Sequence, residues 1–243
     1  LGDDDSLSRL KEIIHTHRSH LGFGVASGRA LELVREALEG NGISEIDVII
    51  ASVGTDIYFG KDCRLEKGWA SRLRTRWRPE RVREALGELP FLRLQTEPYT
   101  QREFKISYNL DENITASEAL PLIHEALAEA RVAYSLIFSH GAFVDILPHR
   151  GSKGKAVRYL ADKWNIPLER VATAGDSGND RDMLIGQTAG IVVGNHDEEL
   201  SDLRQASAHR LYFAHAHCAG GIIEGLQHYG FIEPDAAADE SVV

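Results

Sequence analysis

The sequence has little cysteine and no long hydrophobic run, and each shortage excludes a class of protein. Only Cys63 and Cys218 are present among 243 residues. Two cysteines cannot form a disulfide scaffold, so a reducing compartment is the simpler location. No apolar run approaches the ~18 residues that a membrane span needs, and no signal peptide opens the chain. We therefore predict a cytoplasmic protein without a membrane partner.

Basic residues and methionine are also scarce. The chain has 27 Lys and Arg against 37 Asp and Glu, so its formal charge is −10. Because polyanions attract basic surfaces, this balance argues against a nucleic-acid partner, although a local basic pocket for a phosphorylated substrate stays compatible with it. The single methionine is Met183, so Leu1 is not an initiator residue. We expect that further sequence preceded it.

Short apolar strands alternate with amphipathic helices in the first and last parts of the chain. This alternation predicts an α/β fold with a parallel sheet that helices cover on both faces. Apolar residues at helical spacing predict the helices, and buried runs predict the strands. The expected strands are 21–26, 48–51, 171–174, 191–193 and 211–213, and the expected helices are 6–17, 31–40, 153–164, 198–207 and 221–228.

The middle of the chain follows a different pattern. Between about residues 79 and 148 the order is helix, two strands, helix, two strands, which is typical of an α+β unit with an antiparallel sheet. Ser117 is the expected N-cap of its second helix. The sequence thus predicts a discontinuous core of residues 1–78 and 149–243 with an inserted unit of 79–148. The tail from Pro234 is expected to be disordered.

The strongest chemical signal is the hexapeptide from Gly175 to Asp180, which follows a buried strand and opens a helix. Open α/β sheets present their ligand crevice at such a position. Asp176 and Asp180 are carboxylates four residues apart, a donor pair that suits Mg²⁺, and Asn179 adds a polar contact. An acidic first turn that caps the helix is the alternative interpretation of Asp176 alone.

Two further segments could bind a phosphoryl group. Ser27-Gly28-Arg29 follows a strand, and its hydroxyl and backbone amides could cradle phosphate, although an ordinary N-cap serine with a flexible glycine is the favoured interpretation of the tripeptide by itself. Lys153 and Lys155 stand among small residues at a helix start. A solvated helix face is the favoured interpretation of Lys155.

Together these residues resemble the haloacid dehalogenase (HAD) superfamily of phosphatases. Ser27-Gly28-Arg29 is similar to its second motif, Lys153 to its third, and Asp176 with Asp180 to its fourth. The resemblance is to the branch with a type IIB cap and, within it, to sucrose-phosphate phosphatases. It is equally close to the phosphatase-like domain at the end of many bacterial sucrose-phosphate synthases. The stretches that indicate this narrower group are 52–58, 104–108, 145–148 and 218–223.

The resemblance implies a Mg²⁺-dependent phosphatase for sucrose 6-phosphate or a related sugar phosphate. It implies an HAD-like core and a cap, the unit of residues 79–148, that closes over the sugar. Ser27, Lys153, Asp176 and Asp180 would be catalytic, and Asp176 and Asp180 would hold Mg²⁺. The implied substrate-binding residues are Gly28, Arg29, Gln101, Lys105, Ser139, Asp145 and Asn179.

One motif of that superfamily does not occur in these residues. Its nucleophile lies in an Asp-x-Asp-x-Thr sequence that ends the first core strand, and Asp3-Asp4-Asp5 follows no predicted strand. The resemblance therefore implies that the nucleophile motif lies upstream and that this chain alone is inactive. Two alternatives remain open. The chain could be the C-terminal domain of a sucrose-phosphate synthase, fused to its glycosyltransferase, or a phosphatase for another disaccharide phosphate.

Overall fold

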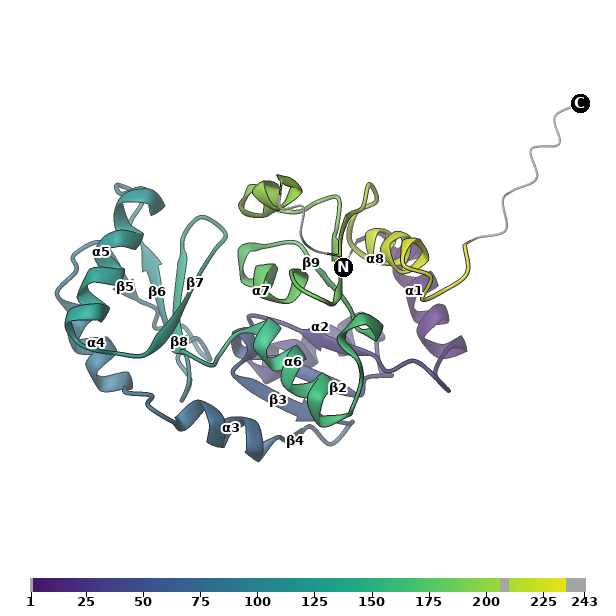
Figure 1. Ribbon diagram of the computed structural model, residues 1–243, viewed down its shortest axis with the longest axis horizontal. Coiled ribbons are helices and arrows are strands. Elements are labelled where there is room, and N and C mark those ends of the chain that lie inside the picture. Colours follow the sequence, from purple (N-terminus) through teal and green to yellow (C-terminus); the bar gives the residue numbers. More distant parts are fainter. Residues whose placement is uncertain (1, 206–209, 235–243) are drawn as a thin grey trace, which may run out of the picture.

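The chain folds into two units that lie side by side, and both ends of the chain contribute to the larger one (Figure 1). The computed structural model describes residues 2–205 and 210–234. In these residues no helix is both long enough and apolar enough to cross a membrane. The smaller unit comes from the middle of the chain, so two connections join it to the larger unit.

The larger unit contains two groups of parallel strands. In one, β1 (Gly24–Ala26) pairs in parallel with β2 (Val48–Ala51). In the other, β10 (Ala189–Val192) lies between β9 (Ala172–Gly175) and β11 (Leu211–Phe213), and both pairings are parallel. The parallel strands confirm the predicted α/β class. Within the described part of the chain, β1 and β9 are each the edge of their sheet.

The first group continues into two antiparallel strands that the sequence pattern did not predict. β3 (Asp56–Phe59) pairs with β2, and β4 (Arg64–Leu65) pairs with β3. The 3₁₀ turn η1 (Ser52–Gly54) reverses the chain directly after β2, so β3 returns beside it without a crossover helix.

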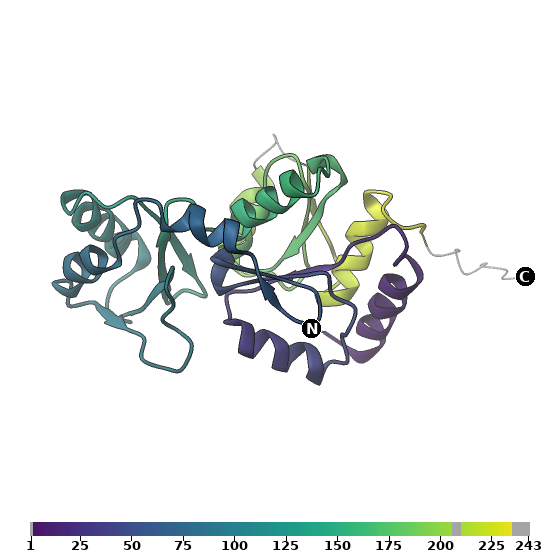
Figure 2. The ribbon, with the colours of Figure 1, turned by 90° about the horizontal axis from the view of Figure 1, so that it is seen from below.

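Helices lie on both sides of the core strands, and Figure 2 shows α2 and α6 on opposite sides. Leu10 and Ile14 of α1 pack against Ile223 of α8, which brings the two ends of the chain together. The α-helices of this unit are α1 (Asp4–Thr16), α2 (Leu31–Gly40), α3 (Lys67–Arg74), α6 (Lys153–Lys163), α7 (Arg181–Leu184) and α8 (Cys218–His228). Its other 3₁₀ segments are η2 (Leu168–Arg170), η3 (Gly178–Asp180) and η4 (Glu198–Gln205).

The smaller unit is an antiparallel sheet in the order β5-β6-β8-β7, with two helices on the face away from the larger unit (Figure 1). Val82 and Leu86 of α4 and Ile123 and Leu127 of α5 are fully buried against the sheet residue Ile106. The strands are β5 (Leu92–Leu94), β6 (Ile106–Leu110), β7 (Tyr134–Ser139) and β8 (Phe143–Pro148), and the helices are α4 (Pro79–Gly87) and α5 (Ala116–Glu129).

The structure corrects three local predictions. The N-cap of α5 is Thr115 rather than Ser117, because Thr115 and Glu118 form a reciprocal capping box. The expected helix over 198–207 is the 3₁₀ segment η4, whose buried residues Leu200 and Leu203 are three apart, as three residues per turn require. The strand expected from residue 21 begins only at Gly24. Residues 206–209 and the tail from residue 235 lie outside the described residues.

Candidate active site

The carboxylate of Asp180 organises the loop that follows β9. Oδ2 of Asp180 accepts hydrogen bonds from the backbone N–H groups of Asp176, at 3.0 Å, and Ser177, at 3.2 Å. A Cβ at Gly175 would lie 2.4 Å from Cβ of Asp180, so only glycine lets the loop close this tightly. The hexapeptide is therefore a compact turn that begins where the strand ends.

Lys153 reaches into this loop from the first turn of α6. Its side chain is 5% exposed, and Nζ donates to Oδ1 of Asp180 at 2.6 Å and to Oδ1 of Asn179. The helix starts here because the Ser152 hydroxyl accepts the N–H of Lys155 as an N-cap. The structure thus brings Lys153 together with Asn179 and Asp180, which are 26 and 27 positions further along the chain. The sequence had singled out all three residues.

The surroundings of Asp176 disfavour the ionised form of its carboxyl group. Burial raises the pKa of the Asp176 carboxyl above its ordinary value, and the nearby Asp180 carboxylate raises it further. A hard cation would relieve this repulsion, and Mg²⁺ binds in proteins through one or two carboxylates while it keeps several waters. The described residues contain no group of three His, Cys, Asp or Glu side chains arranged around a metal. Asp176, with the Asp180 carboxylate beside it, therefore fits Mg²⁺, which needs few protein ligands.

Ser27, Gly28 and Arg29 form the turn after β1. The Ser27 hydroxyl accepts the N–H of Arg29 at 3.1 Å, and a Cβ at Gly28 would lie 3.7 Å from Nδ2 of Asn179. This turn therefore adjoins the Lys153 cluster, at the shared carboxyl end of the parallel strands. Arg29 is exposed.

A strained turn, η1, lies beneath these residues, and sequence reasoning missed its role. Ser52 and Val53 have φ values of 52° and 57°, which a β-branched residue rarely adopts. Gly54 follows with a φ of 90°, and a Cβ there would lie 2.2 Å from the carbonyl carbon of Ser152. The turn is thus pressed against the start of the helix that carries Lys153. The one available signal was the Val-Gly-Thr sequence after a strand.

The proposed sugar-contact residues of the smaller unit divide into two groups. Lys105, which directly precedes β6, and Asp145 of β8 are buried, and Nζ and Oδ1 are 3.5 Å apart. Ser107, which sequence reasoning overlooked, joins them, because it is paired with Asp145 across the sheet and its hydroxyl donates to Oδ1 at 2.5 Å. Ser107 could have been found from its spacing, because residues two apart in an extended segment, such as Lys105 and Ser107, point to the same face.

The other two residues have different surroundings. The amide nitrogen of Gln101 donates to the carbonyls of Gln95, at 3.0 Å, and Ser107, at 2.8 Å, so this side chain braces the loop before β6. Ser139 is buried at the end of β7, beside the hairpin turn that leads into β8.

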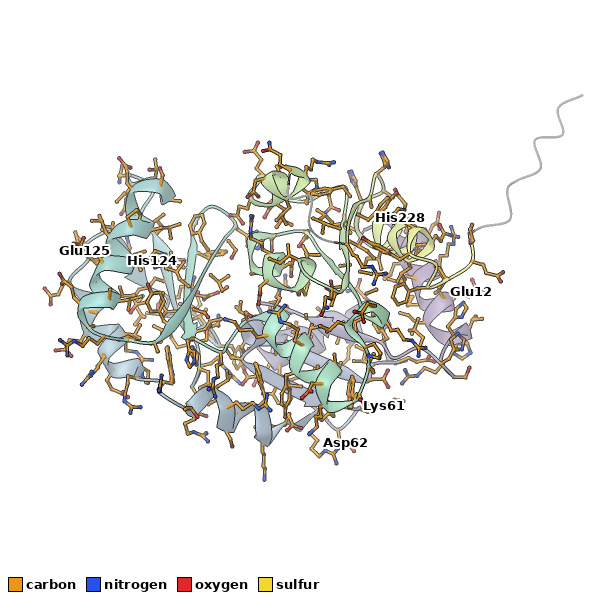
Figure 3. All side chains as sticks on the ribbon, in the orientation of Figure 1. Glu12, Lys61, Asp62, His124, Glu125 and His228 are labelled. Atoms are coloured by element: carbon orange, nitrogen blue, oxygen red, sulfur yellow. The ribbon has the colours of Figure 1, made fainter. Side chains whose placement is uncertain are left out.

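The periphery of the molecule carries exposed charge instead. Figure 3 shows His124 and Glu125 on the outer helix of the smaller unit, and Lys61 and Asp62 in the loop before β4. These side chains lie far from the loops described above.

Comparison with known proteins assigns the chain to a family. The profile described as sucrose-6F-phosphate phosphohydrolase matches residues 1–230. The mannosylfructose-phosphate phosphatase of Agrobacterium fabrum is 32% identical over 235 residues, which are 95% of this chain and 92% of that protein. The chain belongs to the sucrose-6F-phosphate phosphohydrolase family.

Two further relatives of the chain bear on its length and fold. The probable sucrose-phosphatase 2 of Arabidopsis thaliana is 31% identical over 93% of the chain, but the chain spans only 56% of that protein. The sucrose-phosphatase of Synechocystis, solved in complex with sucrose and phosphate, has a TM-score of 0.89 and 30% identity. It covers 95% of this chain, which covers 93% of it. The HAD-like core with a cap, expected from the resemblance, is confirmed.

Proposed function

We propose that this polypeptide contributes the phosphoryl-binding, metal-binding and cap residues of a Mg²⁺-dependent sugar-phosphate phosphatase. The observation that carries the proposal is the buried Lys153 ammonium, held between Asp180 and Asn179 beside the turn of Ser27 and Gly28. A fixed cation next to a serine hydroxyl and a glycine turn is an arrangement that can stabilise a transferring phosphoryl group.

Each of these residues has a role that its contacts support. The Ser27 hydroxyl and the N–H of Gly28 would donate hydrogen bonds to phosphoryl oxygens, and the N–H of Arg29, which donates to Oγ of Ser27, would hold that hydroxyl in place. Lys153 would neutralise charge on the same oxygens, because its ammonium is preoriented and needs no reorganisation when substrate binds. Asn179 fixes the lysine from the other side.

Asp176 would hold Mg²⁺ directly. Asp180 already uses Oδ1 for Lys153 and Oδ2 for two backbone N–H groups, so its contacts favour a role in shaping the loop around Asp176. Its place as a second ligand stays a prediction. When bound, Mg²⁺ would neutralise negative charge on the transferring phosphoryl group.

The cap residues would select the sugar. Lys105, Ser107 and Asp145 form a buried polar group that offers both donors and acceptors, which is the chemistry that sugar hydroxyls require. Sucrose 6-phosphate is the substrate that we propose first. Mannosylfructose phosphate is the second candidate, because the Agrobacterium relative named for it matches nearly the whole chain.

The nucleophile of the proposed reaction is not among these residues. No Asp-x-Asp-x-Thr sequence occurs in the 243 residues, so we propose that the polypeptide alone does not hydrolyse sugar phosphates. We also propose a cytoplasmic location for this polypeptide. Its fusion to, or association with, the glycosyltransferase of a sucrose-phosphate synthase is a further proposal.

The test compares residues 1–243 with the same polypeptide extended at its N-terminus by a β-strand that ends in the Asp-x-Asp-x-Thr motif of the HAD superfamily. Phosphate release from sucrose 6-phosphate, mannosylfructose phosphate and glucose 6-phosphate is measured with Mg²⁺ and with EDTA. We expect activity only in the extended form with Mg²⁺, and its loss in Asp176→Asn. An extended, folded polypeptide that releases no phosphate from any of the three would refute the function. Release by residues 1–243 would refute the predicted inactivity.

A further inference from the structure

The cap touches the core at the tip of one hairpin. The turn between β7 and β8, residues 139–142, lies beside the core segment Asp197–Glu199 (Figure 1). The N–H of Gly141 donates to Oε1 of Glu199 at 2.9 Å, and Nδ1 of His140 lies 3.0 Å from Oδ2 of Asp197. Below the tip, a cavity of about 400 Å³ lies between residues Leu136 to Phe138 of β7 and the core residues Arg181 and Ile185.

The same segment also holds the loop of the candidate active site. The N–H of Asp197 donates to the carbonyl of Asp176 at 2.7 Å. The second oxygen of Glu199, Oε2, accepts the N–H of Gly178 at 2.9 Å. Asp197 and Glu199 therefore each make one contact with the cap tip and one contact with the loop.

Gly178 is the point where all three parts meet. A Cβ there would lie 2.4 Å from Oε2 of Glu199 and 2.6 Å from the carbonyl oxygen of Phe138 in β7. Any side chain at residue 178 would therefore push apart the loop, the bridging segment and the cap strand. The close approach shows that cap position and loop position are not independent in this arrangement.

We propose that Glu199 is a positioning residue that couples docking of the cap tip to the geometry of the Asp176 loop. Its carboxylate has two oxygens, and each accepts one backbone N–H, one from the cap and one from the loop. If the cap swings away, Glu199 loses the Gly141 donor and Asp197 loses His140, so the segment that orients Asp176 and Gly178 is held from one side only. By linkage, a ligand that fixes the loop also favours the docked cap.

The geometric coupling stands without any catalytic role, and its value for catalysis rests on the proposed function. Under that function the cap that contacts the sugar would also complete the metal loop. An empty, open enzyme would then have a looser Asp176 loop than a closed one, so the metal loop would be fully ordered only when the cap is closed over the substrate.

The direct test is amide hydrogen exchange of Gly141 and Gly178, followed by NMR in residues 1–243. Glu199→Gln has nearly the same size, but its amide nitrogen cannot accept a hydrogen bond. The adjacent, exposed Glu198→Gln is the matched control. Because the glutamine amide keeps one accepting oxygen, we expect at least one of the two glycine amides to lose its acceptor and to exchange about tenfold faster in Glu199→Gln, and both to stay unchanged in Glu198→Gln.

The second variant tests coupling rather than local support. His140→Ala changes only the cap tip, and we expect it to accelerate exchange of Gly178 in the core about threefold. Its effect should shrink in the Glu199→Gln background, because the bridge is already broken. Unchanged Gly178 exchange in His140→Ala, or strictly additive effects, would overturn the coupling. These measurements need no activity, so their outcome is separate from that of the phosphatase assay. In the extended polypeptide, Glu199→Gln should lower kcat more than it raises KM.

Discussion

Replacing Lys153 by methionine tests how the buried cation and its partners share the stability of the site. Lys153 and Asp180 are 4% and 3% exposed, and their charged atoms are 2.6 Å apart. Lys153→Met removes one hydrogen bond between charged groups and leaves a carboxylate buried. A hydrogen bond to a charged group contributes about 1.5–3 kcal/mol, and breaking a buried pair costs about 3–5 kcal/mol. Asp180 keeps its two backbone donors, so we expect a cost of about 3 kcal/mol, at the lower end.

The assay is urea unfolding of residues 1–243, followed by circular dichroism, with Lys61→Met as the control. Lys61 is an exposed lysine in the loop before β4 (Figure 3), so its replacement should change the free energy of unfolding by less than about 0.5 kcal/mol. The double variant Lys153→Met/Asp180→Asn removes the unpaired charge but keeps an oxygen for the backbone donors. We expect it to be more stable than Lys153→Met alone. A single variant as stable as the parent, or a double variant that loses still more, would refute this account of the buried pair.

Two further predictions concern groups outside the site. Hydrogen bonds from Tyr212 and the backbone of His215 and Ala216 outweigh the effect of burial and lower the pKa of Glu224 to about 2. Because the folded pKa is depressed, the contribution of Glu224 is complete above the unfolded value and is lost as the pH falls from about 4.5 toward 2. Glu224→Gln should therefore cost about 2 kcal/mol at pH 7 and clearly less at pH 3 in urea unfolding, whereas an equal cost at both values would contradict the assignment. Lys155→Met should lower the free energy of unfolding by about 1–2 kcal/mol, because Nζ ties Ser135 of the cap to the His149 carbonyl in the connection between the units. The companion variant Ser135→Ala should have a smaller effect in the Lys155→Met background, and full additivity would count against this tie.

Lys155 also shows where local sequence was insufficient. A solvated helix face was the favoured interpretation, but the side chain is partly buried and bridges the cap and the connection to the core. Burial lowers the pKa of its ammonium group. The helical pattern of α6 predicts which face of the helix is apolar, but not that the connection from β8 folds back over the polar face. Such a contact depends on the path of a loop, which has no periodicity.

The sequence by itself determined the parallel strands of the core, most of its helices and the loop that holds Asp176. Ser27 and Asp176 each follow a buried run, so local pattern placed both in loops at the carboxyl ends of strands. That the two loops belong to one site came from the family resemblance, because β1 and β9 lie in separate groups of paired strands. Lys153 needed the family resemblance, because a lysine among small residues has no distinctive spacing.

Only the tertiary structure decided how the cap and the loop of Asp176 are joined. Glu199 follows no strand and belongs to no motif. Its carboxylate accepts hydrogen bonds from the backbone N–H groups of Gly141 and Gly178, which are 58 and 21 residues away. Gly178 likewise lies in the predicted hexapeptide, yet the need for glycine there comes from the carbonyl of Phe138 in the cap. Periodicity and motif spacing report contacts within a segment or at a shared sheet edge. A contact between two loops depends on how two folded units dock, which is set by the packing of the whole chain.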